Sequence, residues 1–299
     1  MAVLFPLLAV LIWAANTVVS KAAAGVFDPA AISFYRWLVA AVVLTPLLAR
    51  SLWRRRAELR PHLPHLAVLS LLGMVMYQCL AYYAAHSTTA TNMGVICALI
   101  PLLGLLLNGV VFRQRIAPAA MLGVALSLAG VLYLLGHGDP ASLLSGGINR
   151  GDALMLIGSA SYALYGILYK RWAPPFGQWL NLYAQVLLAV AMLSPLAASA
   201  DSLAIPTAGI PLVLFAGIAS SILAAYFWMR GLQQLGSERT AIFMNLLPLF
   251  TALIASLLLG ETIHAYHWLG GGLILLGVSL TQGGLALLAR RWRPAAQST

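Results

Sequence analysis

Two stretches of the sequence place aromatic and polar side chains on one helix face. Residues at positions i, i+3 and i+7 of a helix share a face, and this spacing relates Trp13, Asn16 and Ser20. The same pattern, shifted by 149 residues, gives Tyr162, Tyr165 and Tyr169. Aromatic rings supply apolar contact area, and amide or hydroxyl groups hydrogen-bond an amino group or a carboxylate without a fixed charge. Such faces predict a binding cavity for a small molecule, although ordinary helix packing produces the same spacing.

Two further segments carry residues of the same kind. Gln78 and Tyr82 share one arc of an apolar stretch, and Met244 and Asn245 stand just before Pro248 in another. Tyr82 lies near the end of its stretch, where aromatic residues also form belts at the membrane surface. We expect these faces to converge on one cavity. The substrate-binding residues predicted from the sequence are Trp13, Asn16, Gln78, Tyr82, Tyr162, Tyr165, Met244 and Asn245.

Two charged residues are predicted to be charge contacts or gate residues. Arg36 lies inside an apolar run, where a charge is costly and by default marks a functional site. It could bind a substrate carboxylate, pair with a carbonyl, or extend its head group to the membrane surface. Glu261 ends another apolar run and could couple transport to protons, cap a helix or act in a gate. We expect the nearby His264 and His267 to be solvated loop residues.

Two prolines, Pro101 and Pro248, occupy matching positions inside apolar segments. A proline within a helix frees a carbonyl group and bends the helix. The two residues are therefore predicted hinges of a gate, with a static kink as the alternative.

The composition excludes a water-soluble enzyme. The chain of 299 residues is 62% hydrophobic and 8% charged, with a mean hydropathy of +0.91, whereas soluble domains are about 25% charged. Cys79 and Cys97 are the only cysteines, and no cluster with metal-ligand spacing occurs. The sequence contains no HExxH, GxSxG or Walker motif, so it predicts no cofactor, no metal and no enzymatic activity. A membrane-embedded enzyme would need convergent acids and bases that Arg36 alone does not provide.

The apolar runs are long and continuous, which predicts membrane-spanning helices of roughly 20 residues rather than a β-barrel. Ten candidates follow from the sequence: Val3–Ala22, Pro29–Leu48, Leu66–Ala85, Thr89–Phe112, Pro118–Gly136, Ala153–Trp172, Trp179–Ala198, Pro211–Met229, Thr240–Gly260 and Tyr266–Leu288. With both termini in the cytoplasm, fourteen of the seventeen Lys and Arg residues lie on the cytoplasmic side. Lys21 and Arg150 lie on the far side, and Arg36 lies within a span. The asymmetry follows the positive-inside rule and accounts for the net charge of +10 without nucleic acid.

An internal repeat divides the chain. A shift of 147 aligns Pro101 with Pro248 and Gly123 with Gly270, and a shift of 149 aligns Lys21 with Lys170. Five spans per half give the halves opposite orientations, an arrangement typical of transporters with a site near the bilayer centre. The fold class predicted is all-α integral membrane, with ten transmembrane helices as two inverted five-helix repeats. The predicted units are a first repeat at 1–136, a linker at 137–149, a second repeat at 150–289 and a basic cytoplasmic tail at 290–299.

Several short motifs occur in a consistent order along the chain. They are Leu11–Asn16, Phe34–Arg36, Ile100–Pro101, Glu238–Ala241, Leu247–Leu249, Leu259–Glu261, Trp268–Gly270 and Leu276–Val278. In these motifs the sequence resembles the drug/metabolite transporter superfamily, specifically its ten-helix EamA-type exporters. The aromatic faces are similar to those of the bacterial aromatic amino acid exporter branch. The shift of 147 aligns Gln114 with Glu261. Only the second half therefore has an acidic residue at this position, and any role of that residue exists in one half alone.

The resemblance implies a multi-pass protein of the bacterial inner membrane that exports a small molecule. We expect a secondary transporter of amino acids, aromatic and other apolar ones favoured, that works by alternating access. A drug or other metabolite exporter on the same fold is the alternative, and the absence of a ring of like residues disfavours a channel. The expected partners are an amino acid and the lipid bilayer, and the sequence does not give the oligomeric state.

Overall fold

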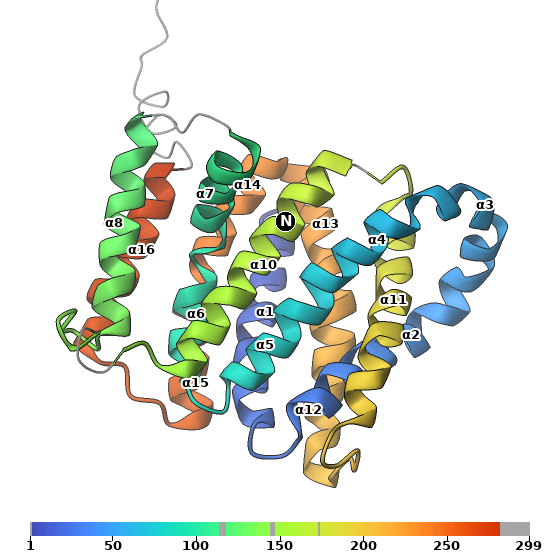
Figure 1. Ribbon diagram of the computed structural model, residues 1–299, viewed down its shortest axis with the longest axis horizontal. Helices are drawn as coiled ribbons and strands as arrows, with labels where there is room; N and C mark the ends of the chain where they lie inside the picture. The colour runs from blue at the N-terminus through green and yellow to red at the C-terminus, as the bar shows by residue number, and fades with distance from the viewer. Residues whose placement is uncertain (1, 114–117, 144–146, 173, 282–299) are drawn as a thin grey trace, which may run out of the picture.

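The computed structural model describes residues 2–113, 118–143, 147–172 and 174–281 (Figure 1). These residues form helices and connecting turns, with no strand among them, as the all-α prediction requires. The predicted tail 290–299, residues 282–289 of the predicted second repeat and Gln114 lie outside the described residues.

The first part of the chain runs up to the connection at 136–149 and is built from a series of helices. They are α1 (Leu4–Ala23), α2 (Pro29–Arg54), α3 (Arg56–Leu59), the 3-10 turn η1 (Arg60–His62), α4 (Leu63–Ser70), the π segment η2 (Leu71–Met76), α5 (Tyr77–Ala84), α6 (Ala90–Cys97), α7 (Ile100–Phe112) and α8 (Pro118–Leu135). The second part contains α10 (Arg150–Trp172), α11 (Gln178–Ala198), the 3-10 turn η3 (Thr207–Gly209), α12 (Ile210–Leu214), the π segment η4 (Phe215–Leu223), α13 (Ala224–Leu235), α14 (Ser237–Ile242), the 3-10 segment η5 (Phe243–Leu246), α15 (Leu247–Leu259) and α16 (Ala265–Thr281).

Seven helical stretches of the described residues are long and apolar enough to cross a membrane, and the bent pair of α6 and α7 makes eight. Two shorter apolar helices, Met121–Leu135 and Ala265–Leu280, accompany them. The structure is therefore that of an integral membrane protein, while ten spans in two inverted repeats remain a prediction. The tenth predicted span, Tyr266–Leu288, runs past the last described residue.

The two prolines start helices rather than interrupt them. Pro101 lies in the first turn of α7, after a break from α6 with a bend of 44°. Pro248 lies in the first turn of α15, directly after η5. The first turn tolerates proline because the N–H group that proline lacks has no partner inside the helix there. The chain bends by 44° just before Pro101, so the prediction of one continuous helix around Pro101 is wrong, whereas Pro248 lies within the unbroken helical stretch Arg239–Leu259.

Further features of α7 and α15 agree. Both are 13 residues long, and both end at a residue in the left-handed region, Arg113 with φ 53° and Gly260 with φ 67°. A π segment also precedes each of the two helices in the chain: η2 lies before α7, and η4 lies before α15. These correspondences match the spacing of the predicted repeat.

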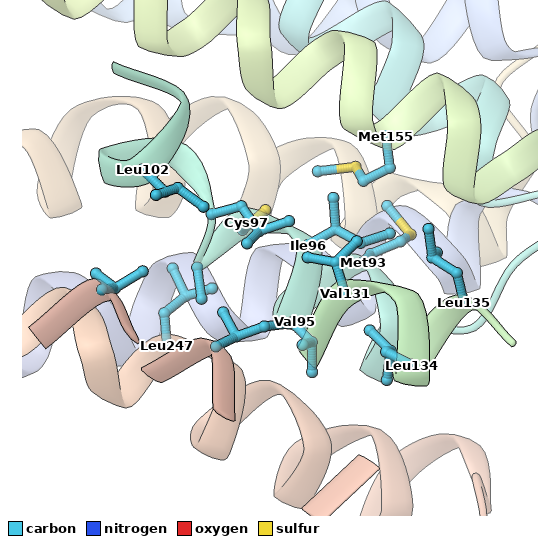
Figure 2. Close-up of a cluster of buried hydrophobic side chains, with 14 of the residues drawn as sticks. Met93, Val95, Ile96, Cys97, Leu102, Val131, Leu134, Leu135, Met155 and Leu247 are labelled. Carbon is cyan, nitrogen blue, oxygen red and sulfur yellow. The ribbon is translucent and has the colours of Figure 1, made fainter. Parts of the chain in front are cut away.

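The core forms around α6, whose eight residues are all buried. Figure 2 shows Met93, Ile96 and Cys97 of α6 beside Met155 of α10. Helices α2 and α11 bury a second apolar cluster that contains Trp37, Leu44 and Leu193. Helices α8 and α16 pack against each other at one edge of the molecule (Figure 1). Helices α1 and α10 occupy its middle, where they can contribute side chains to a central site.

Candidate substrate-binding cavity

A cavity of about 410 Å³ lies among the central helices. Side chains from α1, α2, α5, α10, α11, α13 and the two π segments line it. Small-molecule sites usually have volumes of about 300–1,000 Å³. Among the described residues that line the cavity, none is an Asp or Glu.

Arg36 supplies the positive charge of this cavity. Helix α2 begins at Asp28, whose carboxylate accepts the N–H of Ala30, and Arg36 follows two turns later with only 3% of its surface exposed. Its Nη1 donates to Asn16 Oδ1 at 3.2 Å and to Gln78 Oε1 at 2.9 Å. Its Nε and Nη2 donate to the hydroxyls of Ser221 and Ser220 at 3.1 and 3.0 Å.

All four acceptors of the Arg36 guanidinium are neutral groups. A buried charge without a counter-charge is costly, and hydrogen bonds from neutral groups offset only part of that cost. The ring of Trp37, 5.1 Å from the guanidinium carbon, adds a cation–π contact. The site is therefore electrostatically incomplete and favours an anionic ligand group.

The two serines beside Arg36 come from the π segment η4. A π segment widens one turn of a helix and is frequent at functional sites. Ser221 donates its own hydroxyl hydrogen to Ala216 O at 2.8 Å, so its oxygen is oriented to accept from Arg36. Trp13 Nε1 donates to the backbone oxygen of Ser220 at 3.2 Å, which ties α1 to the same segment.

Aromatic rings form one wall of the cavity. The ring centroids of Tyr77 and Tyr162 are 4.7 Å apart, and those of Tyr162 and Tyr165 are 5.3 Å apart. Tyr169 continues the series at 5.8 Å from Tyr165. Gly73 makes room for this wall, because a Cβ atom there would lie 2.7 Å from Tyr165 Cδ2. The wall offers ring faces and edges to an apolar or aromatic ligand group.

Gln185 contributes an unpaired acceptor to the same cavity. Its side chain is 1% exposed, and its Oε1 has no hydrogen-bond partner among the described residues. A buried carbonyl oxygen without a donor costs about 1–3 kcal/mol. A ligand that brings an N–H donor would remove that cost.

Most of the predicted binding residues meet in this cavity. Its lining includes Trp13, Asn16, Arg36, Gln78, Tyr162, Tyr165 and Met244. Tyr82 and Asn245 do not line it. Tyr82 is 2% exposed and packs with Phe27 and Val213 near the other end of α5. Asn245 lies in the 3-10 segment η5, whose three-residue repeat turns Met244 and Leu247, rather than Asn245, toward the cavity.

The sequence reasoning missed several lining residues. Ser220, Ser221, Gln185 and Tyr77 were not predicted, yet the first two bind Arg36 directly. The available signal was a pair of serines inside an apolar run. Pairing them with Arg36 needs a contact across 184 or more residues, which helix periodicity does not provide.

The cavity extends toward one end of the molecule. Tyr169 lies in the last turn of α10, Gln178 is the first residue of α11, and Leu232 lies in the last turn of α13. These turns are at the upper end in Figure 1. At the lower end Lys21 Nζ donates to Ala85 O at 2.7 Å and ties α1 to the turn after α5. Lys21 is half-buried and does not line the cavity.

A second buried polar cluster joins three helices at the lower end. Asp152, in the first turn of α10, accepts hydrogen bonds from the Thr88 hydroxyl and from Asn92 Nδ2. His267 Nδ1 accepts the N–H of His264 at 3.0 Å, which assigns its proton to Nε2, 3.2 Å from Asn92 Oδ1. His267 is 7% exposed, so the prediction of a solvated loop residue is wrong for it. The rings of His264 and Tyr266 pack near the His267 ring, with centroids 5.8 and 4.2 Å away.

Glu261 lies near this second cluster and away from the cavity. Its carboxylate accepts the N–H groups of Ala90 and Thr91 at 2.7 and 3.0 Å, and the Thr91 hydroxyl at 2.7 Å. A carboxylate is favourable at a helix N-terminus, where N–H groups lack partners and the helix dipole is positive. Of the predicted roles, the geometry corresponds to helix capping, because Glu261 caps α6 and does not touch the substrate cavity.

These features define a helical membrane protein with an internal small-molecule site. Residues 1–136 and 149–282 match the EamA-like transporter family, and the chain belongs to that family. It is therefore a membrane transporter, and this assignment argues against an enzymatic role.

The relatives agree with this assignment. The chain is 26% identical over 271 residues to the transporter YyaM of Bacillus subtilis, covering 88% of each chain. It is 26% identical over 274 residues to the inner membrane transporter YedA of Escherichia coli K12, covering 90% of this chain and 87% of YedA. A crystal structure with 20% identity shares the fold over 98% of this chain and 99% of its own, with a TM-score of 0.63. The names of these relatives specify no substrate.

Proposed function

We propose that the protein is a secondary transporter that exports amino acids, aromatic and other apolar ones favoured, across the bacterial inner membrane. One observation carries the proposal: a buried guanidinium with only neutral acceptors lies beside an aromatic wall. A free amino acid has a carboxylate for the first feature and a side chain for the second.

The carboxylate binds Arg36 in this proposal. An arginine fork suits a planar carboxylate because two parallel N–H groups can donate to its two oxygens. As the carboxylate binds, the oxygens of Asn16 and Gln78 are released from Nη1. These oxygens and Gln185 Oε1 then accept N–H bonds from the ammonium group. The apolar side chain packs on the rings of Tyr162 and Tyr165.

Transport follows by alternating access between two inverted five-helix halves, with both termini in the cytoplasm. The corresponding ends of α7 and α15, and the paired π segments, support the repeat. In that orientation the cavity extends toward the cytoplasm. Opening to the far side requires the contacts of Asp152 and Glu261 to separate, with the bend before Pro101 and the 3-10 segment before Pro248 as hinges.

An exporter of drugs or other metabolites is the second candidate. Arg36 would attract any planar anionic group, and the tyrosine wall accepts many ring systems. The two candidates differ in whether the ammonium group of the ligand contributes to binding.

Counterflow in proteoliposomes that contain the purified full chain tests the proposal. Unlabelled phenylalanine inside should accelerate uptake of labelled phenylalanine. The amine that lacks the carboxylate and the acid that lacks the ammonium group should each compete at least tenfold more weakly. Equal competition by the amine would overturn the carboxylate assignment. Absence of counterflow with every amino acid of a panel, together with transport of a ring-containing organic anion, would favour the second candidate.

A matched pair of variants completes this test. Arg36→Gln should raise the half-saturating amino acid concentration in counterflow at least about tenfold, whereas Arg50→Gln, an exposed change on the same helix α2, should leave it unchanged. Equal loss in both variants would assign the effect to helix α2 or to charge in general rather than to the cavity.

A further inference from the structure

A second cavity, of about 560 Å³, lies between α7 and α10. Residues of α7, among them Gly104 and Asn108, form one side, and residues of α10, among them Gly166, Lys170 and Arg171, form the other. We call this cavity the α7–α10 groove. Ile100 and Tyr162 also line the substrate cavity. These two side chains therefore contribute to both sites.

Two glycines, which have no side chain, leave open space in the α7–α10 groove. Gly104 on α7 and Gly166 on α10 both line it, and a Cβ atom added to either would meet no atom within 4 Å. Helical glycine costs up to about 1 kcal/mol relative to alanine. No protein group takes the space gained by these two glycines among the described residues. The walls are apolar over most of their length. The amide of Asn108 adds little polarity, since its Nδ2 already donates to Gly104 O at 3.0 Å.

The groove is charged at one end only. Lys170 and Arg171, in the last turn of α10, line that end, and no Asp or Glu is among the described lining residues. Lys170 is exposed and forms no hydrogen bond or ion pair with another described residue. An apolar groove with a cationic end complements an amphipathic anion.

We propose that the α7–α10 groove binds an anionic phospholipid. One acyl chain lies along Gly104 and Gly166, and the phosphate group lies at Lys170 and Arg171. Anionic lipids are attracted to basic residues at the end of a membrane helix, by about fivefold per Lys or Arg. A neutral phospholipid gains the apolar contact without this attraction. The proposal depends on the membrane location of the protein and not on the identity of its transported substrate.

A bound acyl chain would also contact Tyr162 and Ile100, the two residues that line both the groove and the substrate cavity. Tyr162 stacks with Tyr77 and Tyr165 on the cavity side. Lipid in the groove would therefore support the aromatic wall from outside. Removal of the lipid should weaken substrate binding without any change to a substrate contact.

Native mass spectrometry of the purified full chain, titrated with phosphatidylglycerol or phosphatidylethanolamine, tests the proposal. The wild type should bind phosphatidylglycerol at least fivefold more tightly. Lys170→Gln should reduce that preference about fivefold, because it removes one cation and adds no bulk. Gly104→Leu and Gly166→Leu should each weaken binding of both lipids about tenfold, because the leucine side chain occupies the groove.

Two controls match these variants. Gly272→Leu changes another exposed helical glycine with open space around its Cβ position, on α16 outside the groove. Arg50→Gln removes an exposed cation elsewhere. Both should bind lipid as the wild type does. Equal affinity of the wild type for the two lipids would overturn the assignment, and so would unchanged affinity in Gly166→Leu and Lys170→Gln. Lys170→Gln remains decisive if the leucine variants fail to fold.

Discussion

The two buried polar clusters of the protein differ in whether a cavity adjoins the buried charge. Around Arg36 the charge is positive, all its acceptors are neutral, and a cavity of about 410 Å³ adjoins it. Around Asp152 the charge is negative, its oxygens accept from Thr88 and Asn92, and neither it nor these partners line the cavity. The partners of both charges are neutral, but only Arg36 lies where a ligand in the cavity can reach it.

This difference separates a binding role from a structural one. A buried charge away from any cavity acts through its contacts within the protein alone, so its loss should appear in stability. A charge that adjoins a cavity can bind a ligand, and water in the cavity can replace it as the partner of the groups that it leaves, so its loss should appear in affinity more than in stability. Variants in each cluster can therefore confirm or break the distinction.

The largest effect is expected for Arg36→Gln. A hydrogen bond to a charged group contributes about 1.5–3 kcal/mol, so the half-saturating amino acid concentration in counterflow should rise about 10- to 100-fold. Thermal unfolding in detergent should stay close to that of the wild type. Arg36→Lys should recover part of the affinity, since it keeps the charge but loses the planar fork. A destabilised protein with unchanged affinity would reverse the roles assigned to the two clusters.

Asp152→Ala is expected to have the opposite signature. It leaves the buried donors of Thr88 and Asn92 unpaired, which should destabilise the protein by about 1–3 kcal/mol. Thermal unfolding measures this loss. Asp201→Ala, at an exposed carboxylate, should change stability by at most about 0.5 kcal/mol. Substrate affinity of the folded Asp152→Ala protein should remain at the wild-type value, and a tenfold loss would contradict a purely structural role.

Glu261→Ala should lower stability by about 1 kcal/mol, because it removes the carboxylate that caps α6. The control is Glu58→Ala, since Glu58 pairs with Arg55 on the surface at 3.0 Å. An exposed pair of that kind contributes about 0–1 kcal/mol, so the control should be the milder variant. Equal stability of the two variants would remove the structural importance assigned to the Glu261 contact.

Gly73→Ala gives the smallest expected change and tests the cavity side of the comparison. The added Cβ would displace Tyr165, so the affinity for phenylalanine should fall a few-fold and that for alanine less. Gly158→Ala places its Cβ at 3.4 Å from Leu80 Cβ, an ordinary contact, and should preserve the ratio. Competition in counterflow measures both. Equal loss for the two amino acids would show that Tyr165 does not contact the larger side chain.

The sequence predicts the class of fold and much of the cavity. Hydropathy and run length suffice for an all-helical membrane protein, because apolar runs of that length have no other stable location. Helix-face spacing brings Trp13 and Asn16, and separately Tyr162 and Tyr165, to the cavity lining. The ten-span arrangement stays a prediction.

The failures have local and long-range causes. Asn245 was misplaced because it was grouped with its neighbour Met244 before Pro248, although adjacent residues of a helix do not share a face. Ser220, Ser221 and the capping contact of Glu261 depend on partners more than 170 residues away. Periodicity within one helix carries no information on such pairs. His267 was expected to be solvated because it lies close to a predicted loop, although it is buried and lies within hydrogen-bond distance of Asn92, 175 residues away in the sequence.

The tight pairing of α8 and α16 has a consequence for biosynthesis. Gly130 and Gly270 let these helices approach closely, since a Cβ on Gly130 would lie 2.7 Å from Gly270 O, and Ser127 donates to Ile274 O at 3.2 Å. Yet α16 begins 130 residues after α8 ends. At about 5–20 residues per second, α8 must wait on the order of ten seconds in the membrane before the ribosome delivers its partner. Its nearly unbroken apolar sequence, with Ser127 as its one hydroxyl-bearing residue besides Tyr133, suits a helix that must tolerate lipid on every side during that interval.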